Sequence, residues 1–504
     1  MKEIKRGYVS NYLIVINFLM AILYLGWWFY FPHMGNKVLY FLLLFGEIYH
    51  VIMAMGFWRT IRKRDGNKIV NYSKDLNPSI DIFITVAGEP ENIVEQTIKN
   101  AKNIQYPNFR IYVLNDGFIA GKDNWQEIEK LAQKMNVNCI TRKSGGGAKA
   151  GNINNGLSQT RGELIAILDA DMVPHKNFLS ALVPYFGDEK VGFVQSPQYY
   201  KNYSENYVTQ GAWDQQNFFF GPIMQGKNNL NSAFICGTNV LIRRKTLDDV
   251  GGMNEKSIAE DFLTSLYIHK KKWKSIYYPF VLCEGLAPED LLSYYRQQHR
   301  WARGSMSILF RHNPFLKLGL SFSQRFEYLL SALYYFNGVI VLIDIIMPLI
   351  FLYFGIQPVS ASTQSFAVFF IPYMFLNLYT LYIISDGNIT FRAISFSQSA
   401  WFLQINALFS LLFNINTKFS VTPKKQQSGN FTYLIIPHLI YISLAIGGII
   451  KNANNYGSNP AVTSNTAWAV FNIIIFLPFI RAAFKPGNEK SLKDNQANNL
   501  SLQV

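Results

Sequence analysis

Cysteine is scarce in this chain, which has only 3 among its 504 residues. Cys139, Cys236 and Cys283 have neither the spacing of metal ligands nor that of a disulfide framework. The sequence therefore excludes a small fold that is stapled by zinc or by disulfides. All three cysteines lie in the polar part of the chain, which suits a reducing cytosol.

A cleavable leader, an internal repeat and a P-loop are also missing. The first apolar stretch, at 10–31, is too long and too aromatic for a signal peptide, and no small-residue cleavage site follows it. The glycine-rich run at 145–152 contains a lysine but not the G-x-x-x-x-G-K-[ST] spacing. These absences favour a retained membrane span and exclude a P-loop nucleotidase.

Charged residues make up only 16% of the chain, and they are unevenly placed. The formal net charge is +15, and much of the excess flanks apolar segments at 2–6 and 59–68. This distribution is the positive-inside pattern and indicates anionic lipid rather than nucleic acid as the partner.

Six stretches are long and apolar enough to cross a bilayer, which takes about 20 helical residues. They are 10–31, 38–58, 328–354, 366–385, 431–450 and 466–484. The connections between the members of each successive pair carry almost no Lys or Arg, whereas the other connections and both ends carry clusters. We therefore predict a multi-pass protein of the cell membrane with both termini and the large polar region in the cytoplasm.

The polar region between the second and third spans alternates strand-like and helix-like pieces. Strands are expected at 80–86, 109–114 and 164–168, and helices at 90–103, 125–134 and 175–185. This alternation predicts an α/β domain with a mostly parallel sheet. The aromatic and basic stretches at 289–325 and 391–413 are too interrupted to span and are expected to be interfacial amphipathic helices.

The predicted division of the chain follows from these segments. It comprises 1–75 (two spans), 76–288 (cytosolic domain), 289–325 (interfacial helices), 326–385 (two spans), 386–430 (interfacial helix and loop), 431–485 (two spans) and 486–504 (a disordered tail).

An apolar run that ends in two carboxylates is the most informative local feature. Residues 164–172 read Leu-Ile-Ala-Ile-Leu-Asp-Ala-Asp-Met, so Asp169 and Asp171 follow a buried strand at positions i and i+2. Such residues share one face of the strand, and open α/β sheets bind ligands at strand ends. The pair suits Mg²⁺ or Mn²⁺ bound together with phosphate oxygens, although an isolated D-x-D is more often a solvated loop.

Two further motifs lie before this pair. Asp116, within Asn115-Asp116-Gly117, follows the strand expected at 109–114. Lys149 lies in the glycine-rich run, where glycines allow close approach to a phosphate and the lysine supplies a positive charge. Each motif alone is also compatible with an ordinary turn.

Two more motifs follow the pair. Glu260 and Asp261 open a helical segment, where acidic residues often do no more than stabilise the helix start. In Gln297-Gln298-His299-Arg300-Trp301, helical spacing places Gln297, Arg300 and Trp301 on one face. Arginine could neutralise a diphosphate and tryptophan could stack on a sugar, but an interfacial tryptophan beside a snorkelling arginine has the same pattern.

Taken in order, these motifs resemble the signature of the processive family 2 glycosyltransferases, which include cellulose, hyaluronan and chitin synthases. The matched residues are Glu89, Asp116, Lys149, Asp169, Asp171, Asp261, Gln297, Arg300 and Trp301. Three segments resemble the cellulose synthase branch: Phe193–Gln198 its VQTPQ segment, Phe234–Asn239 its FFCGT motif and Phe419–Lys424 its FxVTxK gating loop. The resemblance covers nearly the whole chain.

The resemblance implies a fold, a reaction and a set of roles. The fold would be of the glycosyltransferase-A type, inserted among transmembrane helices, and the reaction an inverting transfer from a UDP-sugar with Mg²⁺ or Mn²⁺. The donor-site roles fall to Glu89 and Asp116 (uracil), Lys149 (phosphates), Asp169 and Asp171 (diphosphate, with the metal on Asp171), Gln297 and Arg300 (leaving diphosphate), and Thr422 and Lys424 (a lid). The remaining roles fall to Asp261 (general base), Trp301 (beneath the acceptor sugar), and Phe234, Cys236, Gly237 and Glu260 (acceptor end).

Several departures and alternatives stay open. Asn115 and Ala259 replace residues common in the family, and Val86–Pro90 matches its PTYNE segment only loosely, so Glu89 has the least support. UDP-glucose and a cellulose-like or mixed-linkage β-glucan are implied first, with an N-acetylhexosamine polymer such as hyaluronan second. Non-processive transfer to a lipid carrier and a catalytically inactive subunit are the other readings.

The resemblance also implies export and leaves the regulation open. Polar residues within the spans could line a tunnel for the growing glycan or pack helices together. They are Glu47, His50, Asn337, Asp344 and Asn377. No cyclic-di-GMP-binding domain is seen after the last span, so regulation of that kind would need another subunit or is absent. Accessory export or regulatory subunits are possible partners.

Overall fold

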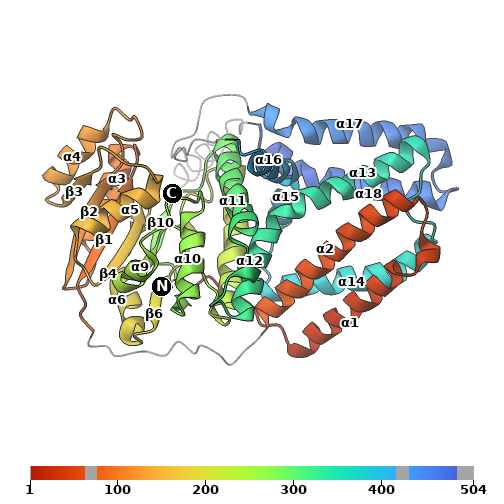
Figure 1. Ribbon diagram of the computed structural model, residues 1–504. Coiled ribbons are helices and arrows are strands. Elements are labelled where there is room, and N and C mark those ends of the chain that lie inside the picture. Colours follow the sequence, from red (N-terminus) through yellow and green to blue (C-terminus); the bar gives the residue numbers. More distant parts are fainter. Residues whose placement is uncertain (1, 63–75, 416–430, 485–504) are drawn as a thin grey trace, which may run out of the picture.

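The computed structural model describes residues 2–62, 76–415 and 431–484. A β-sheet with its covering helices lies at one end, and long helices lie at the other (Figure 1). Between them stand α10 (Glu260–Lys270), α11 (Leu291–His312) and α12 (Phe322–Leu333). The molecule therefore has a polar α/β part and an apolar helical part, joined by helices rather than by a bare linker.

The main sheet has seven strands in the order β3-β2-β1-β4-β8-β6-β9. They are β1 (Ile80–Val86), β2 (Phe109–Asn115), β3 (Asn138–Thr141), β4 (Leu164–Asp169), β6 (Val191–Gln195), β8 (Val240–Arg243) and β9 (Lys274–Tyr277). Four neighbouring pairs are parallel, and β8 runs antiparallel to both of its neighbours. The predicted mostly parallel sheet is confirmed, and β1, β2 and β4 lie where strands were expected, but β3, β6, β8 and β9 were not anticipated.

Burial explains why the central strands were recognisable. Every residue of β1 is buried, and all of β4 is buried except its last residue, Asp169. A strand that is covered on both faces reads as a continuous apolar run. Asp169 is therefore the first polar group where β4 emerges at the edge of the sheet.

Helices cover the sheet, and a small second sheet lies beside its carboxyl edge. The helices of the domain are α3 (Glu91–Lys102), α4 (Trp125–Lys134), α5 (Ala148–Gln159), α6 (Phe178–Leu182), α7 (Tyr207–Phe218), α8 (Met224–Asn228) and α9 (Arg244–Val250). The small sheet has the order β5-β10-β7, with β5 at Val173–Pro174, β10 at Cys283–Gly285 and β7 at Tyr199–Tyr200. A π-helical turn, Phe219–Ile223, joins α7 to α8.

Among the described residues, six apolar helical segments are long enough to span a bilayer, as predicted, and their length and composition indicate a multi-pass membrane protein. They are α1 (Asn11–Trp28), α2 (Lys37–Ile61), the continuous segment Phe322–Phe354 that includes α13 (Asn337–Phe354), α14 (Thr363–Ile384), Thr432–Lys451 with α17 (Ile436–Lys451), and α18 (Pro460–Arg481). The stretch 391–413 forms two shorter helices, α15 (Phe391–Ser399) and α16 (Trp401–Leu412). The last span begins at Pro460 rather than at 466, because Pro at the first turn suits a helix start.

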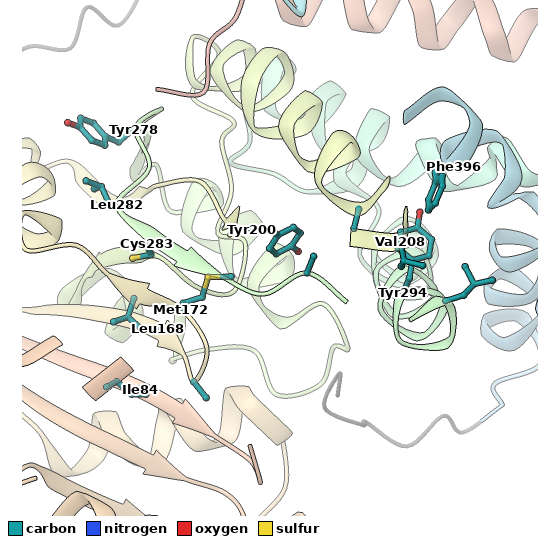
Figure 2. Close-up of a cluster of buried hydrophobic side chains, with 14 of the residues drawn as sticks. Ile84, Leu168, Met172, Tyr200, Val208, Tyr278, Leu282, Cys283, Tyr294 and Phe396 are labelled. Carbon is teal, nitrogen blue, oxygen red and sulfur yellow. The ribbon is translucent and has the colours of Figure 1, made fainter. Parts of the chain in front are cut away.

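One hydrophobic core links the two parts of the molecule. It runs from Ile84 and Leu168 in the main sheet, past Tyr200 in β7, to Tyr294 in α11 and Phe396 in α15 (Figure 2). Close-packed interiors transmit displacements rather than absorb them. The core therefore holds the carboxyl edge of the sheet at a set position relative to the membrane helices.

A buried ionic network reinforces this junction. The carboxylate of Glu327 in α12, which is 1% exposed, accepts hydrogen bonds from Lys227 Nζ (3.0 Å), Arg59 Nη1 (3.0 Å) and Thr60 Oγ1 (2.9 Å). Lys227 belongs to α8 of the α/β part, whereas Arg59 and Thr60 belong to the membrane helix α2. We call these four residues the junction network.

Candidate active site

The carboxyl ends of three parallel strands meet at one edge of the sheet. In the strand register, Thr85 of β1 pairs with Asp169 of β4, and Val86 pairs with Asn115 at the end of β2. Asp116 then follows β2, and its backbone N–H donates to the carbonyl of Val86 (2.8 Å). The sheet therefore brings Asp116 and Asp169 to the same edge, as the sequence predicted.

The two aspartates of the D-x-D motif have different surroundings. The backbone N–H of Asp169 donates to Thr238 Oγ1 (2.8 Å), and its carboxylate pairs with Lys149. Asp171 is only 3% exposed, and its Oδ2 accepts from the backbone N–H of Leu286 (3.2 Å). Both carboxylates are thereby oriented before any ligand binds.

Lys149 connects the donor-site carboxylates to a second chain segment. It lies in the first turn of α5, directly after the left-handed Gly147 (φ 77°), and its Nζ donates to the carbonyl of Gly237 (2.8 Å). Burial lowers the pKa of Lys149, but the charges of Asp169 and Glu260 outweigh it and raise the pKa overall. The lysine therefore stays protonated and can bind an anionic ligand.

Glu260 and Asp261 lie in the first turn of α10, beside the same lysine. Asp261 Oδ1 accepts from the N–H of Phe262 (2.7 Å), and a Cβ on Gly237 would stand 3.2 Å from Asp261 Oδ2. Glycine at 237, with φ 81°, allows this close approach. Burial raises the pKa of Asp261, and burial together with the charge of Asp261 raises the pKa of Glu260. These raised pKa values are typical of groups that take up protons at functional sites.

Helix α11 supplies the remaining predicted residues. It starts at an Asp290 cap, whose Oδ1 accepts from the N–H of Ser293 (2.8 Å), and Gln297, Arg300 and Trp301 lie on the side that faces the strand ends. One cavity of about 2240 Å³ is lined by every predicted site residue in the part of the chain that the structure describes. These are Glu89, Asp116, Lys149, Asp169, Asp171, Phe234, Cys236, Gly237, Glu260, Asp261, Gln297, Arg300 and Trp301. Thr422 and Lys424 lie outside the described residues.

Arg142 is a site residue that sequence reasoning missed. Its Nε and Nη2 donate to the two carboxylate oxygens of Asp116 (both 2.8 Å), and Nη2 also donates to the carbonyl of Ala148 (3.0 Å). The arginine thereby ties the glycine-rich loop to the end of β2. No pattern signals this role, because a single Arg after a short strand is common on any protein surface.

The donor set suits a divalent metal only with help from a ligand. Asp169 and Asp171 offer hard carboxylate oxygens, as Mg²⁺ and Mn²⁺ prefer, but among the described residues no group of three or more His, Cys, Asp or Glu side chains forms a metal cage. The arrangement therefore fits a metal ion that completes its coordination with the phosphate oxygens of a nucleotide.

The same cavity continues among the membrane helices. Glu47, His50, Asp344 and Asn377 line it, and His50 Nε2 lies 3.1 Å from Asp344 Oδ2. Asn337 is absent from its lining and is buried, in keeping with helix packing. Polar side chains at membrane depth are costly unless they face a polar interior or a cavity.

Comparison with known proteins accounts for this arrangement. A model described as "Glycosyltransferase like family 2" matches residues 78–304, and one described as "Cellulose synthase" matches residues 248–449. The chain therefore carries a family 2 glycosyltransferase domain and a cellulose synthase domain, and the two matched ranges overlap at residues 248–304. The glycosyltransferase match ends within α11, at residue 304, and the cellulose synthase match begins before it. The Gln297–Trp301 segment therefore lies within both matched ranges.

Relatives and a solved structure extend the likeness. The chain is 28% identical over 498 residues to the cellulose synthase 1 catalytic subunit (UDP-forming) of Komagataeibacter xylinus, covering 93% of this chain and 66% of the relative. It is 32% identical over 306 residues to the catalytic subunit of Xanthomonas axonopodis pv. citri, covering 59% and 41%. The chain thus spans two thirds or less of these relatives' lengths. A mannosyltransferase from Pyrobaculum calidifontis, solved with GDP-Man and Mn²⁺, shares the fold (TM-score 0.52, 15% identity, covering 74% of this chain and 99% of that one).

Proposed function

We propose that this chain is an inverting β-glycosyltransferase that polymerises UDP-glucose into a β-glucan and exports the polymer through its own membrane segment. The observation that carries the proposal is the shared cavity, because Asp169 and Asp261 line one part of it and Glu47 and Asp344 in the membrane helices line another. A transferase that releases single sugars into the cytoplasm has no need of such a continuation. The cellulose synthase relatives support glucose as the first candidate.

The donor is proposed to bind along the edge of the sheet. Glu89 and Asp116 are assigned to the uracil end, with Arg142 holding Asp116 in position. Lys149 and Arg300 would neutralise the diphosphate, since charged donors suit phosphate oxygens, and Gln297 would bind it through its neutral amide. Mg²⁺ or Mn²⁺ on Asp171 would stabilise the negative charge that develops on the leaving diphosphate.

Asp261 is proposed as the general base. It would take the proton of the acceptor hydroxyl while that oxygen attacks the anomeric carbon and UDP leaves from the opposite face. Attack from that face turns an α-linked donor into a β-linkage. Phe234, Cys236, Gly237 and Glu260 are assigned to the acceptor end, and Trp301 would stack beneath the acceptor sugar.

The transferase domain and both termini are proposed to face the cytoplasm, in accordance with the Lys and Arg clusters beside the spans. In that arrangement the active site meets cytoplasmic UDP-sugars, and the cavity leads away from them across the bilayer. Accessory export or regulatory subunits would then act on the far side or on the cytoplasmic domain.

Purified protein incubated with each UDP-sugar, with Mg²⁺ or Mn²⁺, tests the proposal. We expect a long polymer from UDP-glucose that β-glucanases degrade, and none from the Asp261→Asn control. In sealed vesicles with the domain outside, the polymer should accumulate inside and resist added glucanase. A polymer of N-acetylhexosamine, a lipid-soluble monosaccharide product or a fully accessible polymer would each contradict part of the proposal.

A further inference from the structure

Tyr200 is a buried phenol at the donor site that the predicted signature does not include. It lies in β7, is 2% exposed and lines the same cavity as the two aspartates. Figure 2 shows its ring between Met172 on one side and the helical elements on the other, with the hydroxyl directed away from the main sheet. Its ring therefore belongs to the core that links the two parts of the molecule, while the residue also lines the cavity, where its hydroxyl can meet a ligand.

The small sheet sets the position of this ring. Tyr200 pairs with Gly285 of β10, and the next residue, Leu286, donates its backbone N–H to Asp171 Oδ2 (3.2 Å). Asn202 exchanges two hydrogen bonds with the backbone of Ala287 (3.2 and 2.8 Å). Strand β10 thus supplies the pairing partner of Tyr200, and the residue directly after the strand, Leu286, supplies a hydrogen-bond donor to Asp171.

The polar neighbours of the phenol all belong to the proposed diphosphate site. The side chain of Gln297 interacts with its hydroxyl, and the charges of Asp171, Asp169 and Arg300 act on it. A hydroxyl has one donor and two acceptor positions. If it accepts from the Gln297 amide, its own proton remains available for a phosphate oxygen.

We infer that Tyr200 is a further substrate-contacting residue, which donates a hydrogen bond to the terminal phosphate of the nucleoside diphosphate and positions Gln297 beside it. This inference rests on the proposed function for the identity of the ligand. Burial, followed by the charge of Asp171, raises the pKa of the phenol, so the hydroxyl keeps its proton at neutral pH. A neutral donor adds no negative charge to a site that already holds two carboxylates.

The neighbouring tyrosine offers a matched control. Residues i and i+1 of a strand point to opposite faces, and Tyr199 Oη accepts from Lys2 Nζ (2.6 Å) instead of facing the cavity. Tyr200→Phe and Tyr199→Phe each remove one oxygen from the same strand. A difference between the two variants therefore reports the position of the hydroxyl.

Binding of UDP and of UMP, each with Mn²⁺, to the full-length purified protein tests the inference. We expect Tyr200→Phe to weaken UDP binding about tenfold, as for a lost hydrogen bond to a charged group, and to leave UMP binding within about twofold. Tyr199→Phe should leave both unchanged. The kcat/KM for UDP-glucose should fall with UDP affinity in Tyr200→Phe only.

Two results would overturn the inference: an unchanged UDP affinity in Tyr200→Phe, or equal losses for UDP and UMP, which would indicate a general change in the pocket. Neither depends on polymer formation. A wild-type protein that binds UDP but makes no polymer from any UDP-sugar would refute the proposed function. The effect of Tyr200→Phe on UDP binding could still be interpreted in that case.

Discussion

Two lysine–carboxylate pairs line the same cavity, and they differ in what else their carboxylates bind. In the junction network, Glu327 meets Lys227, Arg59 and Thr60, and the side chains of the Lys–Glu pair are 4% and 1% exposed. In the donor site, Lys149 pairs with Asp169, and their side chains are 17% and 35% exposed, respectively.

This difference in pairing distinguishes a network that stabilises the fold from a site that binds a ligand. The junction network satisfies its charges within the protein, so it joins the α/β part to the membrane helices and needs no ligand. The donor site instead gathers Asp169, Glu260 and Asp261 around one lysine, which leaves negative charge in excess. Burial raises the pKa of both Glu260 and Asp261, and the charge of Asp261 adds to the rise at Glu260. Such an arrangement costs stability and is typical of a site that completes its charge balance with a ligand.

The largest effect on activity is expected when the proposed general base, Asp261, is replaced. Asp261→Asn keeps the size of the side chain but removes the proton acceptor, so we expect kcat to fall about 1000-fold, within the range for a lost general base. Thermal stability should be unchanged or higher, since a buried charge is removed. The rate of polymer synthesis measures kcat, and the melting temperature measures the stability. Release of UDP at the wild-type rate by Asp261→Asn would contradict the assignment of Asp261 as the general base.

Breaking the junction network should act on stability instead. Glu327→Gln leaves Lys227 and Arg59 without their shared counter-charge, and a broken buried ion pair costs about 3 kcal/mol. We expect a markedly lower melting temperature in detergent, with kcat of the folded protein close to wild type. A variant that keeps its stability but loses activity would show that this network belongs to the catalytic machinery after all.

Replacing Lys149, which leaves the base Asp261 in place, should shift the pH dependence of the rate. The base must be deprotonated, so the rate at saturating donor rises with pH through the pKa of Asp261, which burial raises above its ordinary value. Lys149 lowers that pKa, and Lys149→Met removes this effect. The acidic limb of the pH–rate profile should therefore move to higher pH. A move to lower pH, or no move, would show that Lys149 does not lower the pKa of the base.

An ion pair on the surface should have the smallest effect of the three lysine–carboxylate pairs. Lys274 Nζ lies 2.7 Å from Asp188 Oδ2, but the lysine side chain is 49% exposed. Exposed pairs contribute at most about 1 kcal/mol, so Lys274→Ala should change the melting temperature only slightly and the activity not at all. A loss as large as that in Glu327→Gln would mean that burial does not govern these pairs.

Much of the fold was predictable because the relevant signals are local. β1 was expected at 80–86 and forms Ile80–Val86, and α4 was expected at 125–134 and forms Trp125–Lys134. Strand β8 was not expected, since Val240–Arg243 is a short apolar run with no flanking pattern of its own. Its place between β4 and β6 depends on pairing with distant strands.

The predicted site residues were brought together by different means. Asp169 and Asp116 each follow an apolar strand, so their place at the sheet edge follows from the sequence alone. Arg142 carries no such signal, and only the fold brings its guanidinium onto Asp116. Tyr200 likewise reaches Gln297 through the pairing of β7 with β10.

The sequence by itself determined which segments are buried strands, which are long enough to span a membrane, and where carboxylates follow a strand. These properties depend on residues within one turn or one strand of each other. The tertiary structure decided which carboxylates share a lysine, which are fully paired, and that the donor site and the membrane helices line one cavity. Those features require contacts between residues far apart in the chain, which only close packing of the whole molecule brings within reach.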